Sequence, residues 1–247
     1  MKKLTVILLA FISFALPAHV YAANPVVKDA PHLQKPFVNP KDDPDLPNVL
    51  IIGDSISIGY TIAVRKLLHG KADVFRPAAN CMYSGHGAQK MKAWVAKRKW
   101  DVIHFNFGIW DTHYLHNGKL IMPNNLGNYK KEDLKRRYSH QQYIKNLEKV
   151  LKVVKRTKAK LIWASTTPFV SYGEDTKVFL AENNKLAAEL MQDNDVVIND
   201  LYALALPKLK QWQQKDGCHF NPEGYTRLAT QVAAKISTAI TPNVKTR

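Results

Sequence analysis

The fold is decided by one stretch near the start of the chain, Val49-Leu50-Ile51-Ile52-Gly53-Asp54-Ser55-Ile56-Ser57. Its four aliphatic residues are too few for a buried helix, and such continuous apolar runs are typical of strands buried on both faces. Gly53 allows a sharp turn where the strand ends, and a helical pattern follows. Ser55 is therefore expected in the first turn of a helix, where free backbone N–H groups and the helix dipole favour an anion. These residues leave two interpretations open: Ser55 is an ordinary N-cap, or it is a nucleophile whose oxyanion product is held by nearby N–H groups.

The same alternation of a short apolar run and a helical pattern recurs along the chain. Strands are predicted at about 48–52, 72–75, 101–107, 161–164 and 196–198, with helices between them and a last helix ending near residue 240. We recognise no hairpin among these elements, so right-handed crossovers predict an α/β fold with a five-stranded parallel sheet covered on both faces. Ligands bind beyond the carboxyl ends of the strands in such sheets. Residues that follow strands, namely Ser55, Gly85, Asp111 and Thr166, are expected on that rim.

The polar stretch from Thr112 to Tyr138 lies between the third strand and the next helix. A loop this long inside one domain is usually functional or mobile. We predict it as a loop without strands.

The start of the chain predicts export. Residues 1–22 begin with Met1-Lys2-Lys3, continue with an apolar run and end in small residues, which is the pattern of a secretory signal peptide cleaved near Ala22. Residues 23–47 are Pro-rich and predict a linker or an arm packed on the domain, which spans 48–240 and is followed by a tail at 241–247. No later segment approaches about 20 apolar residues, so no transmembrane segment is expected after cleavage. The mature protein is expected in the periplasm or outside the cell.

The charge of the chain is strongly basic. Loss of Lys2 and Lys3 with the signal peptide lowers the net charge from +16 to +14. Such a surface attracts nucleic acid, anionic lipid or acidic polysaccharide, although dispersed lysines also make an ordinary solvated face. Because exported nucleic-acid binders are uncommon, an acidic glycan or the cell envelope is the favoured partner and nucleic acid is not expected. Neither metal-ligand spacing nor a phosphate-binding Gly-rich loop is found, so no metal and no cofactor are predicted.

The second informative pattern lies before the last helix, where Asp216 and His219 are three residues apart. This spacing lets a carboxylate hold one imidazole nitrogen while the other faces a nucleophile, which is the arrangement used in acyl transfer. Asp-x-x-His alone is a weak signal, and a surface pair is the alternative. The longer string Asp-Gly-x-His-x-Asn-x-x-Gly-Tyr, at 216–225, is far more specific.

Together, these motifs resemble those of SGNH/GDSL-type hydrolases over about residues 48–238. The resemblance assigns the nucleophile to Ser55 in the first motif, and the rest of the triad to Asp216 and His219 in the last. In the second motif, near Asn80 to Gly85, it implies that the Gly85 N–H joins the Ser55 N–H in binding the oxyanion. It also implies a flavodoxin-like, three-layer α/β/α sandwich and hydrolysis of esters or thioesters without a metal.

The third motif departs from the family pattern Gly-x-Asn-Asp, because here it reads Gly108-Ile109-Trp110-Asp111. Loss of the oxyanion donor that the Asn provides would cost about 100–1,000-fold in rate. Three interpretations remain: the indole N–H of Trp110 donates instead, Asn80 or the main chain fills the position, or the enzyme is weak or inactive. Trp110 also offers a wall for a sugar ring. Trp110, Asp111 and Asn80 are the candidate substrate contacts.

Four other residues are judged from their place in the sequence. The resemblance brings the loops of Cys81 and Cys218 to the same pocket, so we predict a disulfide between them, with two free thiols as the alternative. His113 and His116 lie in the long polar stretch, where each either meets substrate or is an ordinary surface histidine.

The predicted protein is an exported serine esterase that hydrolyses short acyl esters, with O-acetyl groups on a carbohydrate as the favoured substrate. The grounds for the substrate are export, the basic surface, exposed aromatic residues and the lack of a long apolar lid. A lipid esterase or lysophospholipase and an O-acyltransferase remain alternatives. In a different class, the domain is a catalytically inactive glycan- or envelope-binding module. The sequence does not predict the oligomeric state.

Overall fold

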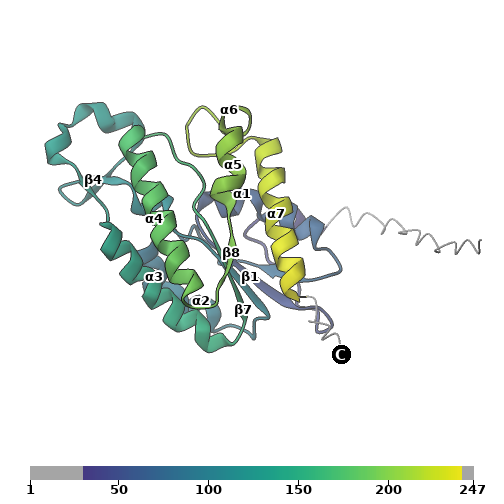
Figure 1. Cartoon of the computed structure of the whole chain (residues 1–247). Coiled ribbons are helices and arrows are strands. Elements are labelled where there is room, and N and C mark those ends of the chain that lie inside the picture. Colours follow the sequence, from purple (N-terminus) through teal and green to yellow (C-terminus); the bar gives the residue numbers. More distant parts are fainter. Residues whose placement is uncertain (1–29, 241–247) are drawn as a thin grey trace, which may run out of the picture.

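The computed structural model describes residues 30–240, so the predicted signal peptide and C-terminal tail lie outside the described residues. A five-stranded parallel sheet runs through the centre of the molecule in the order β2-β1-β3-β7-β8 (Figure 1). This order is that of flavodoxin-like folds. The strands are β1 Asn48–Ile52, β2 Asp73–Phe75, β3 Val102–Phe105, β7 Lys160–Ala164 and β8 Val197–Asn199. The predicted parallel sheet is confirmed.

Helices cover both faces of this sheet. Two helices, α1 Ser55–Leu67 and α7 Pro222–Ile240, pack together on one face. Three helices pack side by side on the other face: α2 Ser84–Val95, α3 His140–Val154 and α4 Glu174–Gln192. Successive residues of β1 alternate between the two cores: Val49 and Ile51 pack with α1 and α7, whereas Leu50 and Ile52 pack with α2 and α3. The predicted three-layer α/β/α sandwich is confirmed. A strand buried on both faces needs apolar side chains at every position, which explains the continuous apolar run of β1.

The boundaries of the helices follow local chemistry. The Ser-x-x-Gln pattern at 139–142 predicts a capping box, and α3 begins with it: the Ser139 hydroxyl and the Gln142 side chain each accept a backbone N–H of the other residue. The sequence predicts one helix over about 201–210, but the structure interrupts it at Pro207, because proline cannot donate the hydrogen bond that a continuous helix needs there. The α-helices are α1 Ser55–Leu67, α2 Ser84–Val95, α3 His140–Val154, α4 Glu174–Gln192, α5 Leu201–Ala205, α6 Leu209–Trp212 and α7 Pro222–Ile240. The 3₁₀ helices are η1 Pro31–Leu33, η2 Ile109–Asp111, η3 Pro123–Asn128, η4 Lys131–Asp133, η5 Lys155–Thr157 and η6 Leu206–Lys208.

The stretch from Thr112 to Tyr138 contains a small antiparallel sheet, so the prediction of a loop without hairpins is wrong. Its strands are β4 Tyr114–His116, β5 Lys119–Ile121 and β6 Lys135–Arg136, in the order β5-β4-β6. Asn117 and Gly118 connect β4 to β5 with φ angles of 48° and 76°. An Asn-Gly pair between two short strands is the strongest local signal for a two-residue hairpin. The signal was therefore present in the sequence, but the polar composition of the stretch masked it.

Residues 30–47 pack against the domain through buried Arg65 of α1. The guanidinium group donates hydrogen bonds to the backbone carbonyls of His32, Lys35 and Val38 and to the Asn39 side chain. Arg65 is only 3 % exposed, so these carbonyls provide the partners that a buried cation requires. The described part of the Pro-rich segment is thus an arm held on the domain.

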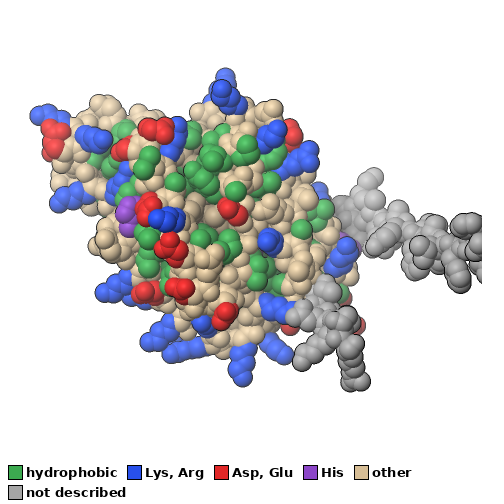
Figure 2. Space-filling view, in the orientation of Figure 1, with side chains coloured by type: hydrophobic (Ala, Val, Ile, Leu, Met, Phe, Trp, Pro, Cys, Tyr) green, Lys and Arg blue, Asp and Glu red, His purple; other side chains and the backbone are tan. Residues whose placement is uncertain are grey.

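Lysine and arginine side chains are spread over the face shown in Figure 2, most densely along its lower edge, with acidic side chains between them. This distribution matches a solvated basic face. Among residues 30–240, no helix is both long and apolar enough to span a membrane.

Candidate active site

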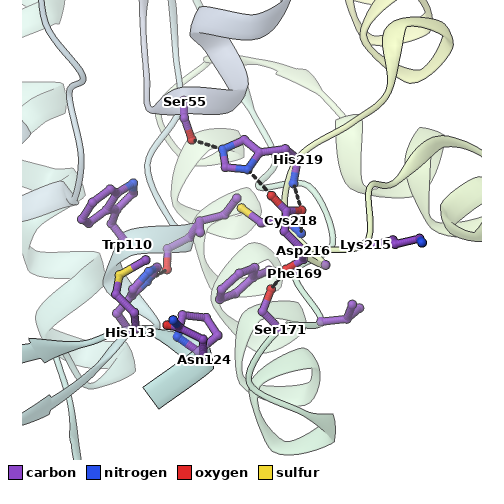
Figure 3. Close-up of a pocket in the computed structure, with 15 residues that line it drawn as sticks. Ser55, Trp110, His113, Asn124, Phe169, Ser171, Lys215, Asp216, Cys218 and His219 are labelled. Atoms are coloured by element: carbon purple, nitrogen blue, oxygen red, sulfur yellow. Dashed lines mark hydrogen bonds and ion pairs between the residues drawn. The ribbon is translucent and has the colours of Figure 1, made fainter. Parts of the chain in front are cut away.

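Ser55 is the first residue of α1 and lies directly beyond the carboxyl end of β1 (Figure 3). The preceding Asp54 is the N-cap of this helix, and its carboxylate accepts the Ile56 N–H at 3.0 Å. Asp54 is 1 % exposed, and burial raises its pKa to about 6. The strand, the turn and the cap together fix Ser55 at the edge of the sheet with its hydroxyl in a pocket.

Ser55, His219 and Asp216 form a continuous hydrogen-bonded chain. The Ser55 Oγ lies 2.9 Å from His219 Nε2, and His219 Nδ1 lies 2.6 Å from Asp216 Oδ2. A carboxylate only accepts hydrogen bonds, so Nδ1 carries the proton and Nε2 is free to accept the Ser55 hydroxyl proton. The structure therefore brings together the three residues that the sequence predicts as a triad, although 164 positions separate Ser55 from His219.

The turn that carries Asp216 also orients its carboxylate. Oδ1 accepts the backbone N–H groups of Cys218 and His219 at 3.0 and 2.9 Å, while Oδ2 faces the imidazole. Burial alone would raise the pKa of Asp216, but the hydrogen bonds from the His219 ring and these backbone groups outweigh it and lower the pKa. Asp216 is thus ionised at neutral pH and holds His219 in one tautomer and one orientation.

The Ser55 hydroxyl and the His219 ring open into a pocket of about 570 Å³. One wall comes from the triad loop and the other from the segments that follow β3 and β7, with the inserted antiparallel sheet contributing its β5 end. In Figure 3, Lys215 points away from Ser55 and His219. The lining residues are Ser55, Ile109, Trp110, His113, Met122, Pro123, Asn124, Phe169, Val170, Ser171, Lys215, Asp216, Gly217, Cys218 and His219.

Trp110 lines this pocket, and its indole nitrogen lies on the ring edge that faces the Ser55 side (Figure 3). The indole N–H has no hydrogen-bond partner among residues 30–240, while the backbone carbonyl of Trp110 accepts Arg137 Nε at 2.9 Å. The backbone is therefore anchored and the donor is unused. This arrangement is compatible with both functions predicted for Trp110, an oxyanion donor and a wall of the substrate site.

Asp111 does not contact the pocket, which corrects the prediction that it binds substrate. The side chain is fully buried and accepts hydrogen bonds from the backbone N–H and the hydroxyl of Ser84, the first residue of α2. Burial raises its pKa to about 7. Asp111 instead connects the start of α2 to η2, the turn that follows β3, by hydrogen bonds to Ser84.

Gly85 and Asn80 are not among the pocket-lining residues, so their predicted roles in binding the oxyanion or substrate stay predictions. Gly85 is buried in α2, where a Cβ would overlap the Tyr138 hydroxyl. The Asn80 side chain accepts the Met82 N–H at 2.9 Å, and the neighbouring Cys81 N–H donates to the Gly53 carbonyl at 3.2 Å. Their loop therefore lies beside the turn that carries Ser55.

Cys81 and Cys218 are both free thiols, which corrects the predicted disulfide. Cys81 is buried in the core beneath α2 and α3, whereas Cys218 packs against the core beneath α1 and α7. These cores lie on opposite faces of the sheet, so the two side chains pack with different sets of residues. Neighbouring loops at the rim did not imply neighbouring side chains.

The pocket also contains residues that the sequence analysis missed or left undecided. His113 lines the pocket, whereas His116 stacks near Tyr129 with ring centroids 4.8 Å apart. Phe169 and Val170 follow β7, so the rule that ligands bind beyond strand ends could have identified them. Met122 and Asn124 had no comparable signal, because only the inserted sheet brings them to this rim. No group of three or more His, Cys, Asp or Glu residues within 30–240 is arranged to hold a metal ion.

Comparison with known proteins identifies a family for most of the chain. The sequence profile of the GDSL-like Lipase/Acylhydrolase family matches residues 51–227. A search of curated proteins returns no match.

Solved structures with the same fold include three esterases or acylhydrolases, all under 20 % identical to this chain. A lipase/acylhydrolase from Enterococcus faecalis has a TM-score of 0.62 and 19 % identity, and the match covers 79 % of this chain and 98 % of the other. An acetylxylan esterase from Geobacillus stearothermophilus has a TM-score of 0.59 and 17 % identity, with 77 % and 94 % covered. A carbohydrate esterase family 3 protein from Talaromyces cellulolyticus has a TM-score of 0.58 and 18 % identity, with 78 % and 97 % covered. At this identity, the similarity shows a common fold.

Proposed function

Because the chain belongs to the GDSL-like lipase/acylhydrolase family and is a carboxylic ester hydrolase, we propose that it acts through Ser55 on O-acetyl groups of a carbohydrate. The observation that carries the proposal is the hydrogen-bonded chain from Ser55 through His219 to Asp216, which opens into the pocket. This chain of nucleophile, base and orienting carboxylate is the minimum that serine acyl transfer requires.

In the first half of the proposed reaction, Ser55 Oγ attacks the ester carbonyl carbon while His219 Nε2 takes the hydroxyl proton. Asp216 stabilises the imidazolium that forms, and the Ser55 N–H binds the oxyanion at the start of α1. The indole N–H of Trp110 is our candidate for the donor that replaces the family asparagine, because it is unpaired and faces the nucleophile in Figure 3. The bond to the alcohol then breaks, and His219 returns its proton to the leaving oxygen.

In the second half, water attacks the acyl group on Ser55 while His219 accepts a proton from the water. Collapse of the second tetrahedral intermediate releases the acid and restores the Ser55 hydroxyl. In this collapse His219 returns the proton to Ser55 Oγ, so the ester and water are the only reactants besides the protein groups named. If a sugar hydroxyl replaced water, the same intermediate would yield acyl transfer instead.

The substrate proposal depends on the wall opposite the triad. Aromatic rings from Trp110, His113 and Phe169 line it, and such rings suit the mixed apolar and polar surface of a sugar. The names of two structures with this fold, an acetylxylan esterase and a carbohydrate esterase, support the same substrate class by analogy. The signal-peptide pattern at residues 1–22 supports an exported enzyme that meets such polymers outside the cytoplasm.

The proposal is tested by comparing p-nitrophenyl acetate hydrolysis by the wild-type protein and by Ser55→Ala. Removal of the nucleophile should lower kcat by about 10⁴-fold or more. Ser139→Ala is the control for a Ser-to-Ala change, because Ser139 caps α3 and does not line the pocket, and its effect on kcat should stay within about tenfold. Equal activity of Ser55→Ala and the wild type would rule out this mechanism.

The acyl and alcohol specificity then separates the alternatives. We expect p-nitrophenyl acetate to be a better substrate than the octanoate, and acetylated xylan to release acetate. Release of fatty acid from lysophospholipid in preference to acetate from xylan would favour the lipid esterase. Formation of an acetylated sugar acceptor instead of free acetate would favour the acyltransferase.

A further inference from the structure

Three aromatic rings form a stacked column along one wall of the pocket. The rings of Trp110 and His113 have centroids 5.1 Å apart and planes inclined by 10°, and those of His113 and Phe169 are 5.5 Å apart and inclined by 12°. The three residues come from the η2 turn, the segment before β4 and the segment after β7. His113 is the middle ring, so both of its faces are covered by aromatic side chains.

The hydrogen bonding of His113 fixes its tautomer. Nδ1 lies 2.9 Å from the Ile109 carbonyl oxygen, which can only accept, so Nδ1 carries a proton. The ring is 5 % exposed, and burial lowers its pKa to about 4; the bond to Ile109 opposes this shift and the charge of Arg137 adds to it. The imidazole is therefore neutral near pH 7, and its Nε2 presents a lone pair.

The Nε2 edge is the part of the ring left free to face the pocket. Trp110 and Phe169 cover the two faces, Nδ1 is occupied by Ile109, and Tyr172 packs against the ring at 83°. Nε2 has no hydrogen-bond partner among residues 30–240, and it is not one of the buried, unpaired side-chain nitrogens within that range. Because His113 lines the pocket that contains Ser55 and His219, this acceptor is available to a bound substrate.

An unpaired acceptor in an aromatic wall selects for the chemistry of its partner. A hydroxyl group can donate to Nε2 without bringing a charge into the wall. Carboxylate and phosphate oxygens only accept, so they would leave Nε2 unsatisfied and face its lone pair. A ligand that lacks the donor loses affinity, because a polar group desolvated without a partner costs more than the hydrogen bond itself contributes.

We propose that His113 Nε2 accepts a hydrogen bond from a free hydroxyl of the alcohol half of the ester, and thereby selects partly acetylated neutral sugars. Fully acetylated sugars lack the required donor, and anionic esters place acceptors against it. This specificity rests on the proposed esterase function, because it concerns the alcohol that Ser55 releases. It makes His113 a determinant of which ester is hydrolysed, separate from the triad that hydrolyses it.

The first test compares two sugars in the same enzyme: methyl β-xylopyranoside carrying one acetyl group, and the fully acetylated xyloside. The readout is the ratio of their kcat/KM values for acetate release, so that a general loss of activity cancels. His113→Phe retains an aromatic ring in the column but removes both ring nitrogens, and we expect this ratio to fall by about tenfold. His116→Phe is the matched control, because His116 packs against Tyr129 and does not line the pocket. An unchanged ratio in His113→Phe, or an equal fall in His116→Phe, would overturn the proposal.

The second test does not require turnover. In Ser55→Ala, which keeps His113 intact, methyl β-xylopyranoside should move the ¹⁵N resonance of His113 Nε2 in the direction expected for an unprotonated nitrogen that accepts a hydrogen bond. Absence of a shift up to the solubility limit of the sugar would overturn the assignment. A shift together with a wild-type protein that hydrolyses no acetyl ester would refute the proposed function while retaining the sugar contact, so the two failures are distinguishable.

Discussion

The two walls of the pocket are built differently. The triad wall uses two short segments, residues 53–57 and 216–219, and each is positioned by its own local hydrogen bonds, such as the Asp54 cap and the turn around Asp216. The aromatic wall draws one ring from each of three segments, and its members are held by stacking across the fold. The groups of the proposed chemistry are thus encoded locally, whereas the surface proposed to recognise the substrate is assembled from distant parts of the chain. In a fold shared by many esterases, this division lets the second wall change while the first is kept.

Trp110 is part of the aromatic wall and also carries the candidate oxyanion donor, so its replacement has the largest effect expected among the changes outside the triad. Trp110→Phe keeps a ring beside His113 but removes the indole N–H. If that group binds the oxyanion, kcat for p-nitrophenyl acetate should fall by about 100-fold with little change in KM. The measurement is steady-state kinetics, with Trp94→Phe in α2 as the control, because Trp94 does not line the pocket. A change in KM alone would show that Trp110 contributes to substrate binding and not to binding of the oxyanion.

Asp111 sharpens the comparison, because it follows Trp110 in the chain but is buried outside the pocket, whereas Asp216 lines the pocket in the triad wall. Asp216 is ionised, whereas burial raises the pKa of Asp111 from 3.8 to about 7. At a pH between 3.8 and about 7, Asp111 is ionised in the unfolded chain but protonated in the folded protein. The free energy of unfolding therefore falls as the pH rises from about 4 to 7. Asp111→Asn cannot ionise and keeps the shape of the protonated side chain. Its free energy of unfolding relative to the wild type should therefore rise by about 2–4 kcal/mol between pH 4 and 8.

Urea denaturation at both pH values measures this change. Buried Asp54 also has a raised pKa, and its charge contributes to the shift at Asp111, so the difference reports the titration of Asp111 in the presence of Asp54. A difference that is constant with pH would show that Asp111 is ionised throughout. A difference that falls with pH would contradict the assigned sign.

The smallest effect is expected in the inserted sheet. Gly118 has φ = +76° in the β4–β5 turn, and a Cβ there would meet nothing within 4 Å, so Gly118→Ala adds backbone strain without a clash. We expect a loss of about 1 kcal/mol in the free energy of unfolding, with faster amide exchange confined to β4 and β5. Gly127→Ala is the matched control, since its position is equally open and its φ is not in the left-handed region. Equal behaviour of the two variants would mean that the turn does not depend on Gly118.

Local patterns were sufficient to predict most of the sheet and the reacting groups. The apolar run before Ser55, the capping box of α3 and the Asp-x-x-His turn each express a short-range physical preference, and each is present in the structure. The Asn117-Gly118 turn also expresses a short-range preference, so the hairpin at β4 and β5 was predictable from the sequence. The predicted disulfide failed for a different reason: loop proximity says nothing about which face of a sheet a side chain enters.

The sequence by itself determined the α/β fold, because turns, caps and buried strands depend on neighbouring residues. The resemblance of its motifs to those of a known family indicated the family and grouped Ser55, His219 and Asp216. Only the tertiary structure decided that Asp111 is buried, that Cys81 and Cys218 lie in separate cores, and that His113 is the middle ring of an aromatic column. These properties depend on packing between segments that the crossovers of the sheet bring together. Burial and the Ile109 carbonyl then set the charge and tautomer of His113, which no pattern along the chain specifies.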